Sequence, residues 1–259
     1  MTFFSIEKKM LLGCKEKTVL ELNKKKALIT GSTQGIGFAI AKCLSEAGAT
    51  VFLNGVNEEK AQRAAEQIEG SRVALCDLSL PDCADRLYEK TGDVDILILN
   101  ASIQYRKAWN EITDEEFDKQ MAVNLKASLK LIQKYAPYMQ KQAWGRIIAL
   151  GSVQQKKPHK DMLIYAAAKS AQENMVRNLA KQLAPFGITV NNVAPGVIET
   201  PRNYEALADQ EYAKQVINGI PCGYAGLPTD CSGLFLLLCS EEGRYMTGED
   251  IYIDGGMKL

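Results

Sequence analysis

The sequence predicts an α/β fold built on a single doubly wound parallel sheet of about seven strands, with helices on both faces. Short apolar runs rich in β-branched residues alternate with longer amphipathic segments along the chain. The runs are apolar throughout rather than at every second position, which is typical of parallel strands buried on both faces. No linker or repeat divides residues 25–259, so we expect one domain there, preceded by an N-terminal extension at residues 1–24.

The order of the elements follows from the pattern of apolar residues. The predicted strands are the runs at residues 26–30, 50–54, 72–76, 94–100, 145–151, 188–194 and 249–254. Between them, residues 36–48, 57–70 and 114–139 show the spacing of amphipathic helices, and the first two of these segments end on glycine, as helices commonly do. Right-handed crossovers then place the helices on both sides of the sheet.

The composition argues against several kinds of partner. Lys and Arg together number 31, as do Asp and Glu, so the formal net charge is zero and we expect neither nucleic acid nor a membrane as partner. The seven cysteines form no CxxC pair and the chain has one histidine, so we expect no metal site, and reduced thiols of a cytoplasmic protein. The apolar run at residues 234–239 is too short to span a bilayer.

Residues 164–172, IYAAAKSAQ, place a phenol and an ammonium on one helix face. Alanine is the strongest helix former, and residues four apart on a helix are neighbours, so Tyr165 and Lys169 are expected to lie side by side. By itself this spacing is more typical of a surface helix with a half-buried tyrosine and a lysine whose stem packs on apolar surface. The surrounding motifs decide between the two interpretations.

A glycine-rich segment, TGSTQGIG, follows the first predicted strand and opens the first helix. Gly31, Gly35 and Gly37 allow the chain to turn sharply and to approach a pyrophosphate, which then sits on the helix N-terminus. The spacing GxxxGxG differs from the general GxGxxG fingerprint. Its position after the first strand of an alternating chain favours dinucleotide binding over a purely structural turn.

Taken in order, the motifs resemble those of the classical short-chain dehydrogenase/reductase family, which has a Rossmann-type fold, and the resemblance covers nearly the whole chain. Besides TGxxxGIG and YxxxK, the matching segments are CDLS with Asp77 and Leu78, LNAS at 99–102, MAVNLKAS with Asn124, IALGSV with Ser152, APGVIET at 194–200 and IDGG at 253–256. The segments after LNAS and APGVIET further resemble the gluconate 5-dehydrogenase and 2-dehydro-3-deoxygluconate dehydrogenase branch.

The resemblance implies hydride transfer between a nicotinamide cofactor and a secondary alcohol or ketone, catalysed by Asn124, Ser152, Tyr165 and Lys169. Tyr165 is the implied general acid or base, and Ser152 contacts the substrate oxygen. Lys169 favours the phenolate and holds the nicotinamide ribose, while Asn124 holds a water that links Lys169 to solvent. A unit charge at ~4 Å and an effective dielectric of ~20 is worth ~4 kcal/mol, enough to lower a phenol pKa by ~3 units before desolvation.

The glycine loop and the family motifs together predict the residues that contact the cofactor. These are Gly31, Thr33, Gln34, Gly35, Ile36, Gly37, Asn54, Val56, Asp77, Leu78, Asn100, Ala101, Ser102, Tyr165, Lys169, Pro195, Gly196, Ile198 and Thr200.

Two regions depart from the family pattern. Leu99 and Ser102 stand where the family's NNAG motif has Asn and Gly, while Asn100 is retained. After the second strand, Gly55 stands where an acid would bind the NAD ribose and Val56 where an arginine would bind the NADP phosphate. Losing the acid removes repulsion toward a phosphate, but lacking an arginine leaves the phosphate unpaired. The cofactor is therefore NAD or NADP, and the balance slightly favours NAD.

Loop residues around the predicted cleft carry the substrate hypotheses. Arg106 follows LNAS where the gluconate branch has an arginine, and such a side chain can bind a carboxylate bidentately, although it is equally typical of a charged surface loop. His159 precedes the YxxxK helix, and Arg202 and Asn203 lie in the segment that covers the substrate. A lone loop histidine is more often incidental than a ligand.

Three functions remain open. The first is a dehydrogenase or reductase of a sugar acid, ketose or polyol; the second is a 3-oxoacyl-thioester reductase; the third is a non-catalytic NAD(P)-sensing protein on the same fold. The missing arginine near Val56 counts against the second, for which NADPH is typical, and the retained Ser152, Tyr165 and Lys169 count against the third. The resemblance also implies a homotetramer or a homodimer.

Overall fold

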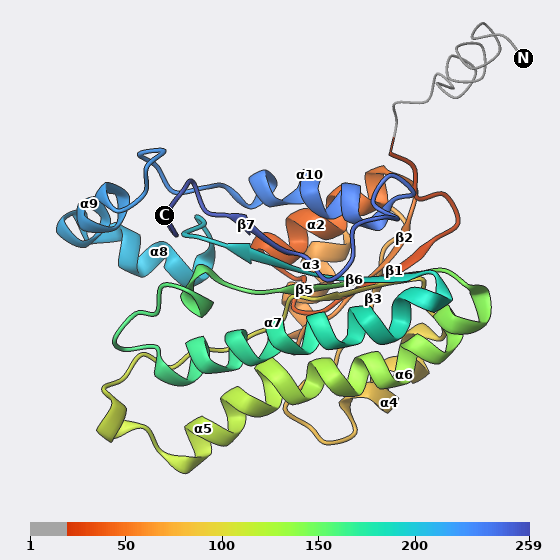
Figure 1. The fold of residues 1–259 in the computed structure, drawn as a ribbon, viewed down its shortest axis with the longest axis horizontal. Coiled ribbons are helices and arrows are strands. Elements are labelled where there is room, and N and C mark those ends of the chain that lie inside the picture. The colour runs from red at the N-terminus through yellow and green to blue at the C-terminus, as the bar shows by residue number, and fades with distance from the viewer. Residues whose placement is uncertain (1–19) are drawn as a thin grey trace, which may run out of the picture.

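The computed structural model describes residues 20–259, and within them it shows one seven-stranded sheet in which each strand runs parallel to its neighbours (Figure 1). The strands are β1 (Lys26–Ile29), β2 (Thr50–Leu53), β3 (Arg72–Val73), β4 (Ile96–Leu99), β5 (Gly145–Leu150), β6 (Ile188–Pro195) and β7 (Asp250–Ile253). Their order is β3-β2-β1-β4-β5-β6-β7. The predicted fold class is confirmed, and the order reverses between β1 and β4, where ligands of doubly wound sheets bind.

Helices cover both faces of the sheet (Figure 1). On one face lie α4 (Cys83–Thr91), α5 (Asp114–Met121), α6 (Ala127–Gln142) and α7 (Leu163–Leu183), and on the other α2 (Gly35–Glu46), α3 (Glu58–Ala65) and α10 (Pro228–Cys239). Two further helices, α8 (Pro201–Ala208) and α9 (Gln210–Asn218), lie together beyond one end of the sheet. Short helical turns occupy Trp109–Glu111 (η1), Ala122–Lys126 (η2), Val153–Gln155 (η3) and Ala184–Phe186 (η4).

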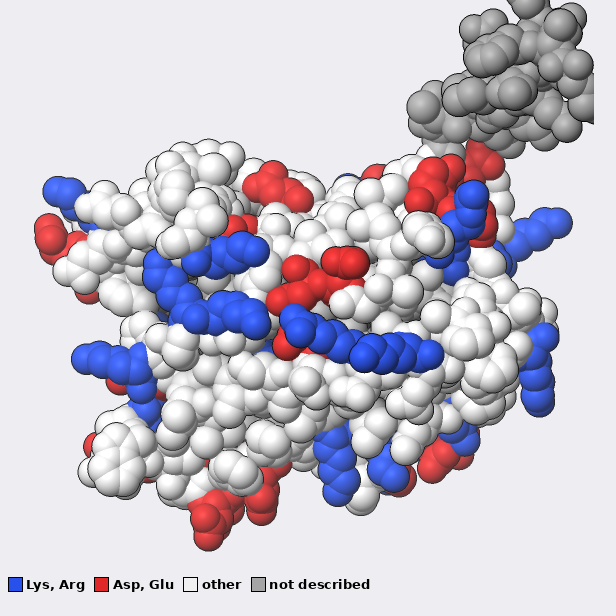
Figure 2. All heavy atoms as spheres, viewed as in Figure 1, with Lys and Arg blue, Asp and Glu red and all other residues white. Residues whose placement is uncertain are grey.

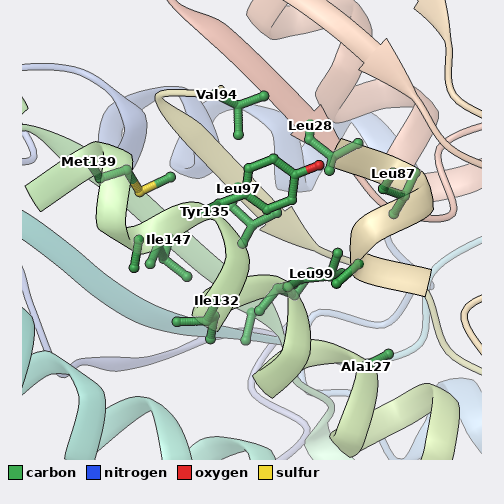
Figure 3. Packing of buried hydrophobic residues seen from close by; sticks show 14 of the residues in the cluster. Leu28, Leu87, Val94, Leu97, Leu99, Ala127, Ile132, Tyr135, Met139 and Ile147 are labelled. Carbon is green, nitrogen blue, oxygen red and sulfur yellow. The ribbon is translucent and has the colours of Figure 1, made fainter. Parts of the chain in front are cut away.

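The two faces of the sheet bury separate apolar clusters, which explains why the strands show no polar alternation. In β4, Leu97 and Leu99 join a cluster shared with α4, α6 and α7, whereas Ile96 and Ile98 join a cluster shared with α2, α3 and α10. Figure 3 shows the ring of Tyr135 among the apolar side chains of the first cluster. The Tyr135 hydroxyl is satisfied by a hydrogen bond of 2.8 Å with a threonine hydroxyl of α4.

The predicted strand at residues 72–76 is wrong in length, since β3 ends at Val73. The reason is a side chain. Asn54, directly after β2, donates its amide to the carbonyls of Ala74 and Cys76 at 3.0 and 3.2 Å. A side-chain amide thus takes the carbonyls that a longer strand would pair with its neighbour, while the backbone N–H groups of Ala74 and Cys76 still donate to Leu53 and Gly55 at 2.8 and 3.0 Å.

The amphipathic stretch predicted at residues 114–139 is helical throughout, but it is not one regular α-helix. A π-helical turn, Ala122–Lys126, interrupts it between α5 and α6. Such a turn carries an extra residue, so it rotates the side chains on either side of it relative to one another, and it occurs frequently at functional sites. The period of apolar residues along the sequence is too coarse to reveal one additional residue.

Residues 1–19 of the predicted extension lie outside the described residues. From residue 20 onward the chain contacts the domain, because Leu22 is buried in the cluster shared with α2 and its amide donates to the Ala47 carbonyl at 2.7 Å. Between residues 20 and 259, no helix is both long and apolar enough to cross a membrane.

Charges of both signs are interspersed on the surface. Figure 2 shows basic side chains in a broken band across the face in view, with acidic side chains among and beside them. In the described part of the chain the six cysteines are free thiols, four of them buried: Cys76, Cys83, Cys231 and Cys239.

Gly187 and Gly233 form a matched pair for testing the turn that leads into β6. Gly187 has φ of +71°, and a Cβ there would lie 2.2 Å from the Ala143 carbonyl oxygen, whereas a Cβ at Gly233 would meet no atom within 4 Å. We expect Gly187→Ala to lower the free energy of unfolding by about 2 kcal/mol or more. We expect Gly233→Ala, in helix α10, to raise it by about 0.5–1 kcal/mol. Urea unfolding measures both, and equal effects of the two substitutions would contradict this account of the turn.

Candidate active site

A cavity of about 600 Å³ lies where the chain leaves β1, β4, β5 and β6. Its wall is formed by the glycine loop, the segments after β2 and β3, the segment after β4, the segment between β5 and α7, and the start of α8. The cavity therefore occupies the position that the reversal of strand order predicts for a ligand.

The structure brings most of the predicted site residues to this one cavity. Every residue that the sequence predicts to contact cofactor or substrate is part of the lining, with the exception of Lys169. Lys169 and Asn124 are buried behind the wall, with 1% and 0% of their surface exposed.

The glycine loop (TGSTQGIG) is held in place by a residue that follows β4, the strand next to β1. Asn100, directly after β4, donates its side-chain amide to the carbonyls of Thr30 and Gly31 at 2.7 and 2.9 Å. Gly31 and Gly35 both have φ of +61°, a conformation that favours glycine. A Cβ at Gly37 would lie 2.5 Å from the Asn100 amide nitrogen, so the helix can start this close to β4 only with glycine at that position.

The loop has the properties of a phosphate site. Gln34, the N-cap of α2, makes no side-chain hydrogen bond to the helix, so the first backbone N–H groups of α2 are not capped by it. These groups and the helix dipole attract an anion. The residues present therefore fit the pyrophosphate of a dinucleotide.

The corner that distinguishes NAD from NADP contains a packing constraint. A Cβ at Gly55 would lie 2.6 Å from the Thr33 methyl carbon, so Thr33 occupies the space that an acidic side chain at position 55 would need. Val56 next to it is 73% exposed. The acid at this end of the lining is Asp77, whose carboxylate accepts hydrogen bonds from the backbone N–H and the hydroxyl of Ser79, both 2.8 Å long.

Tyr165 and Ser152 face the cavity from two elements that meet there. Tyr165 lies in the first turn of α7 and is 7% exposed, and Ser152 follows β5 and is 9% exposed. The Ser152 hydroxyl oxygen accepts a hydrogen bond of 3.2 Å from the backbone N–H of Gln154. Its own O–H remains free to donate to a ligand oxygen.

Lys169 lies one turn after Tyr165, and its Nζ is 5.9 Å from the centroid of the phenol ring. The ammonium donates to the Leu150 carbonyl at 2.5 Å and to Gln172 Oε1 at 3.0 Å. Burial and, to a lesser extent, the positive charge of the nearby Arg202 lower the pKa of Lys169 to about 7. Lys169 therefore has a pKa close to neutrality, which the sequence argument, based on Coulomb attraction alone, did not anticipate.

Asn124 lies in the π-helical turn and holds the loop after β4. Its Oδ1 accepts from the backbone N–H of Ile103 at 2.9 Å, and its Nδ2 donates to the Ile103 carbonyl at 2.8 Å. The amide thus pairs both backbone groups of one loop residue. Each amide atom keeps one further hydrogen-bonding position for a water.

The predicted substrate residues already have partners within the protein. Arg202 donates from Nη1 to the Ser102 hydroxyl at 3.0 Å and from Nη2 to the Ser102 carbonyl at 2.5 Å. Arg106 donates to the Tyr212 hydroxyl at 2.9 Å and lies over that ring at 5.6 Å. Ser102, a departure from the family motif, therefore ties the loop after β4 to α8, while Arg106 ties it to α9.

Asn203 and His159 differ in whether their side chains keep a hydrogen-bonding group without a partner among the described residues. Asn203 donates its amide to the Ile198 carbonyl at 2.9 Å, which holds the start of α8 onto the segment after β6. His159 Nδ1 accepts from the Asp161 backbone N–H at 3.2 Å, so its other ring nitrogen, Nε2, has no hydrogen-bond partner among the described residues.

The charges that line the cavity are unevenly distributed. Among the described lining residues, the cations are Arg106, Lys119 and Arg202, and Asp77 is the one acid. Asp77 follows β3, whereas the three cations lie after β4, on α5 and on α8, so the carboxylate and the cations come from different parts of the wall. Residues 20–259 contain no group of three or more His, Cys, Asp or Glu side chains placed to hold a metal ion.

Comparison with known proteins identifies the family. A family model described as enoyl-(acyl carrier protein) reductase matches residues 31–258. The human dehydrogenase/reductase SDR family member 4 is 31% identical, with 91% of this chain and 88% of that protein aligned. The chain belongs to the short-chain dehydrogenase/reductase family. It is therefore an oxidoreductase.

Members of the family similar to this chain carry different names. The 3-oxoacyl-(acyl-carrier-protein) reductase FabG of Aquifex aeolicus is 34% identical over 92% of this chain and 99% of its own. Glucose 1-dehydrogenase of Gluconobacter oxydans is 36% identical over 91% of this chain and 92% of its own. The family assignment therefore does not select a substrate.

Solved structures similar to this chain also include both a 3-oxoacyl reductase and a gluconate dehydrogenase. A 3-oxoacyl (acyl-carrier-protein) reductase of Agrobacterium tumefaciens with NADP bound has a TM-score of 0.89 and 34% identity, covering 94% of this chain and 98% of its own. A Beutenbergia cavernae protein described as an NAD(P)-dependent gluconate 5-dehydrogenase, with bound NADP, has a TM-score of 0.87 and 30% identity, covering 92% and 98%.

Several residues that shape this short-chain dehydrogenase/reductase site have no signal in the sequence. Tyr212 and Gln172 contact Arg106 and Lys169, yet neither lies in a family motif. Gln120 accepts from the backbone N–H of Tyr105 at 3.3 Å and supports the same loop as Asn124. These contacts depend on where α9, α7 and α5 pack, which local sequence does not specify.

Proposed function

We propose that the protein interconverts a secondary alcohol and a ketone on a substrate that carries an acidic group, with a sugar acid as the first candidate. The observation that carries the proposal is the wall of the cavity, in which the described residues include three cations, Ser152 and Tyr165, and in which Asp77 is the one acid. Guanidinium groups bind carboxylates through paired hydrogen bonds. Relatives described as gluconate dehydrogenases support the same substrate class.

The chain's own residues would orient the substrate and move a proton. The free O–H of Ser152 donates to the substrate oxygen and fixes it beside the Tyr165 hydroxyl, which gives or takes the proton at that oxygen. The Lys169 ammonium favours the phenolate form of Tyr165 and holds the nicotinamide ribose, and Asn124 holds a water that connects Lys169 to solvent. The bound nicotinamide cofactor supplies or accepts the hydride.

A 3-oxoacyl thioester is the second candidate substrate. The same cavity is lined by apolar side chains that could contact an acyl chain, namely Ile103, Met162, Leu207, Val216 and Met257. Relatives named 3-oxoacyl-(acyl-carrier-protein) reductase support this candidate. We place it second because the cations of the cavity wall suit a small acid better than an uncharged thioester group.

We propose NAD as the preferred cofactor, in a cytoplasmic enzyme that assembles as a homotetramer or homodimer. At the corner formed by Thr33, Gly55 and Val56, no described lining residue is basic, so a 2′-phosphate would lack a charged partner there. The Thr33 methyl excludes an acid at position 55, which leaves the preference for NAD modest rather than strict.

Replacing the proposed acid–base group tests the mechanism. We expect Tyr165→Phe to lower kcat by about 100-fold or more, because the proton at the substrate oxygen loses its donor or acceptor. Binding of NADH, followed by its fluorescence, is expected to stay unchanged. Full turnover by Tyr165→Phe would contradict the mechanism, whereas lost cofactor binding would show that the Tyr165 hydroxyl is needed to bind the cofactor.

Removing the arginines tests the acidic substrate. We expect Arg202→Met and Arg106→Met each to raise KM for acidic substrates by about 10-fold or more, because a charge-assisted hydrogen bond is lost. KM for neutral polyols should change little. Arg63→Met is the control, since the Arg63 side chain is on the exposed side of α3 and forms an ion pair with Glu59. If both substrate classes respond equally, the arginines do not recognise the acidic group.

Adding a basic side chain tests the assignment of the cofactor corner. We expect Val56→Arg to raise the ratio of kcat/KM for NADP to that for NAD by about 10-fold or more, because the 2′-phosphate gains a charged partner. Val56→Gln, polar but uncharged, is the control and should leave the ratio close to that of the wild-type protein. An unchanged ratio in Val56→Arg would mean that this corner does not contact the ribose.

A further inference from the structure

Gln172 makes a buried contact with the lysine of the site and belongs to none of the motifs discussed above. It lies three residues after Lys169 on α7 and is 1% exposed. Its Oε1 accepts a hydrogen bond of 3.0 Å from Lys169 Nζ, and its Nε2 donates to the Ser128 hydroxyl of α6 at 2.9 Å. A chain of hydrogen bonds thus joins Lys169 to α6.

The orientation of the Gln172 amide follows from its partners. An ammonium can only donate, so the carbonyl oxygen of the amide must face Lys169 and the NH₂ group must face Ser128. Ser128 is 5% exposed, so the whole chain of hydrogen bonds is shielded from water. In such surroundings a hydrogen bond to a charged group is strong, and an unpaired charge is costly.

Lys169 depends on this contact because no carboxylate of residues 20–259 forms an ion pair with it. On its own helix, Glu173 forms an ion pair with Arg177, and Arg202 on α8 opposes the positive charge. The acceptors bonded to the ammonium are the Leu150 carbonyl and Gln172 Oε1. Two dipoles, and no opposite charge, therefore keep the proton on Lys169.

The other elements packed against α7 offer no replacement. Strand β6 and the turns η3 and η4 contain no acidic or basic residue. Arg146 of β5 is bonded to the Ser240 carbonyl, Lys126 of η2 is exposed, and Glu116 of α5 is paired with Lys107. The remaining charged residues of α5 are exposed: Asp114, Glu115, Asp118 and Lys119.

We propose that Gln172 is a positioning residue that keeps the Lys169 ammonium charged and fixed in place, with Ser128 setting the orientation of its amide. Of the three N–H groups on Lys169, one goes to β5 and one to Gln172. The two hydrogen bonds fix the direction of the third N–H group. This group can donate to Tyr165, to the cofactor ribose or to a water. The inference rests on the proposed role of Lys169, but its test needs neither substrate nor turnover.

The test follows the pKa of Lys169 directly by NMR of protein labelled with ¹³C at lysine Cε. Because burial brings this pKa to about 7, its resonance titrates apart from ordinary lysines, and Lys169→Met identifies it by removing it. We expect Gln172→Met, similar in volume but without the carbonyl, to lower the pKa by about one unit or more. We expect Gln172→Glu to raise it, because the new carboxylate favours the ammonium.

Gln182→Leu is the matched control, since Gln182 lies on the same helix, is exposed and is remote from the lysine in sequence. It should leave the pKa unchanged. Opposite shifts in the two Gln172 variants support the proposal, because general loosening of the fold would not reverse sign between them. A pKa that does not fall in Gln172→Met, or does not rise in Gln172→Glu, overturns it.

Circular dichroism shows whether each variant is folded. If Gln172→Met is unfolded, the direction in which the Lys169 pKa shifts in Gln172→Glu tests the proposal. The proposed function fails separately, through absence of turnover in the wild-type protein. Where turnover is measurable, the alkaline limit of kcat/KM for alcohol oxidation should move in the same direction as the pKa of Lys169 in each variant.

Discussion

The buried ammonium of Lys169 is the interaction on which the proposed chemistry depends. Placing a charge at 1% exposure is costly, and within the described part of the chain no carboxylate is bonded to this ammonium. This cost lowers the pKa of Lys169 from its ordinary value to about 7. The Leu150 carbonyl and the Gln172 amide reduce the cost by accepting hydrogen bonds from the ammonium. A lysine poised in this way can exchange a proton near neutral pH, which an exposed lysine cannot.

Side-chain amides organise the rest of the site. Asn100 holds the glycine loop, Asn54 holds the segment after β3, and Asn124 holds the loop after β4. Each lies at or near the end of a regular element, where backbone groups lose their partners in a ladder or helix. A short side chain with one donor group and one acceptor satisfies them and, at the same time, fixes the walls of the cavity.

Motifs and apolar periodicity predicted the α/β class, the strand positions and the family, because these depend on local patterns. The sequence also predicted which residues gather at the cavity, because family motifs at the carboxyl ends of parallel strands must meet at one edge. It did not predict the π-helical turn at Asn124, the shortened β3 or the low pKa of Lys169. These depend on one inserted residue, one side-chain amide and the depth of burial, all of which arise from tertiary packing.

The structure shows what two departures from the family pattern, Ser102 and Gly55, contact. Ser102 gives Arg202 two acceptors and so ties α8 to the loop after β4, and Gly55 leaves room for the Thr33 methyl. The first contact holds a guanidinium beside the proposed reacting groups, and the second removes the acid that would otherwise define the cofactor. We propose that both departures bear on specificity, and that the first also bears on the acid–base chemistry, because Arg202 contributes to the lowered pKa of Lys169.

The most direct test of the central claim is a substrate screen by absorbance of the reduced nicotinamide. The wild-type protein is assayed with NAD and NADP against sugar acids, neutral polyols of matched length and 3-oxoacyl thioesters. We predict the highest kcat/KM for a sugar acid, well above that of its neutral counterpart. Equal rates for acids and neutral polyols, or turnover of thioesters alone, would contradict recognition of an acidic substrate by the cations of the cavity wall.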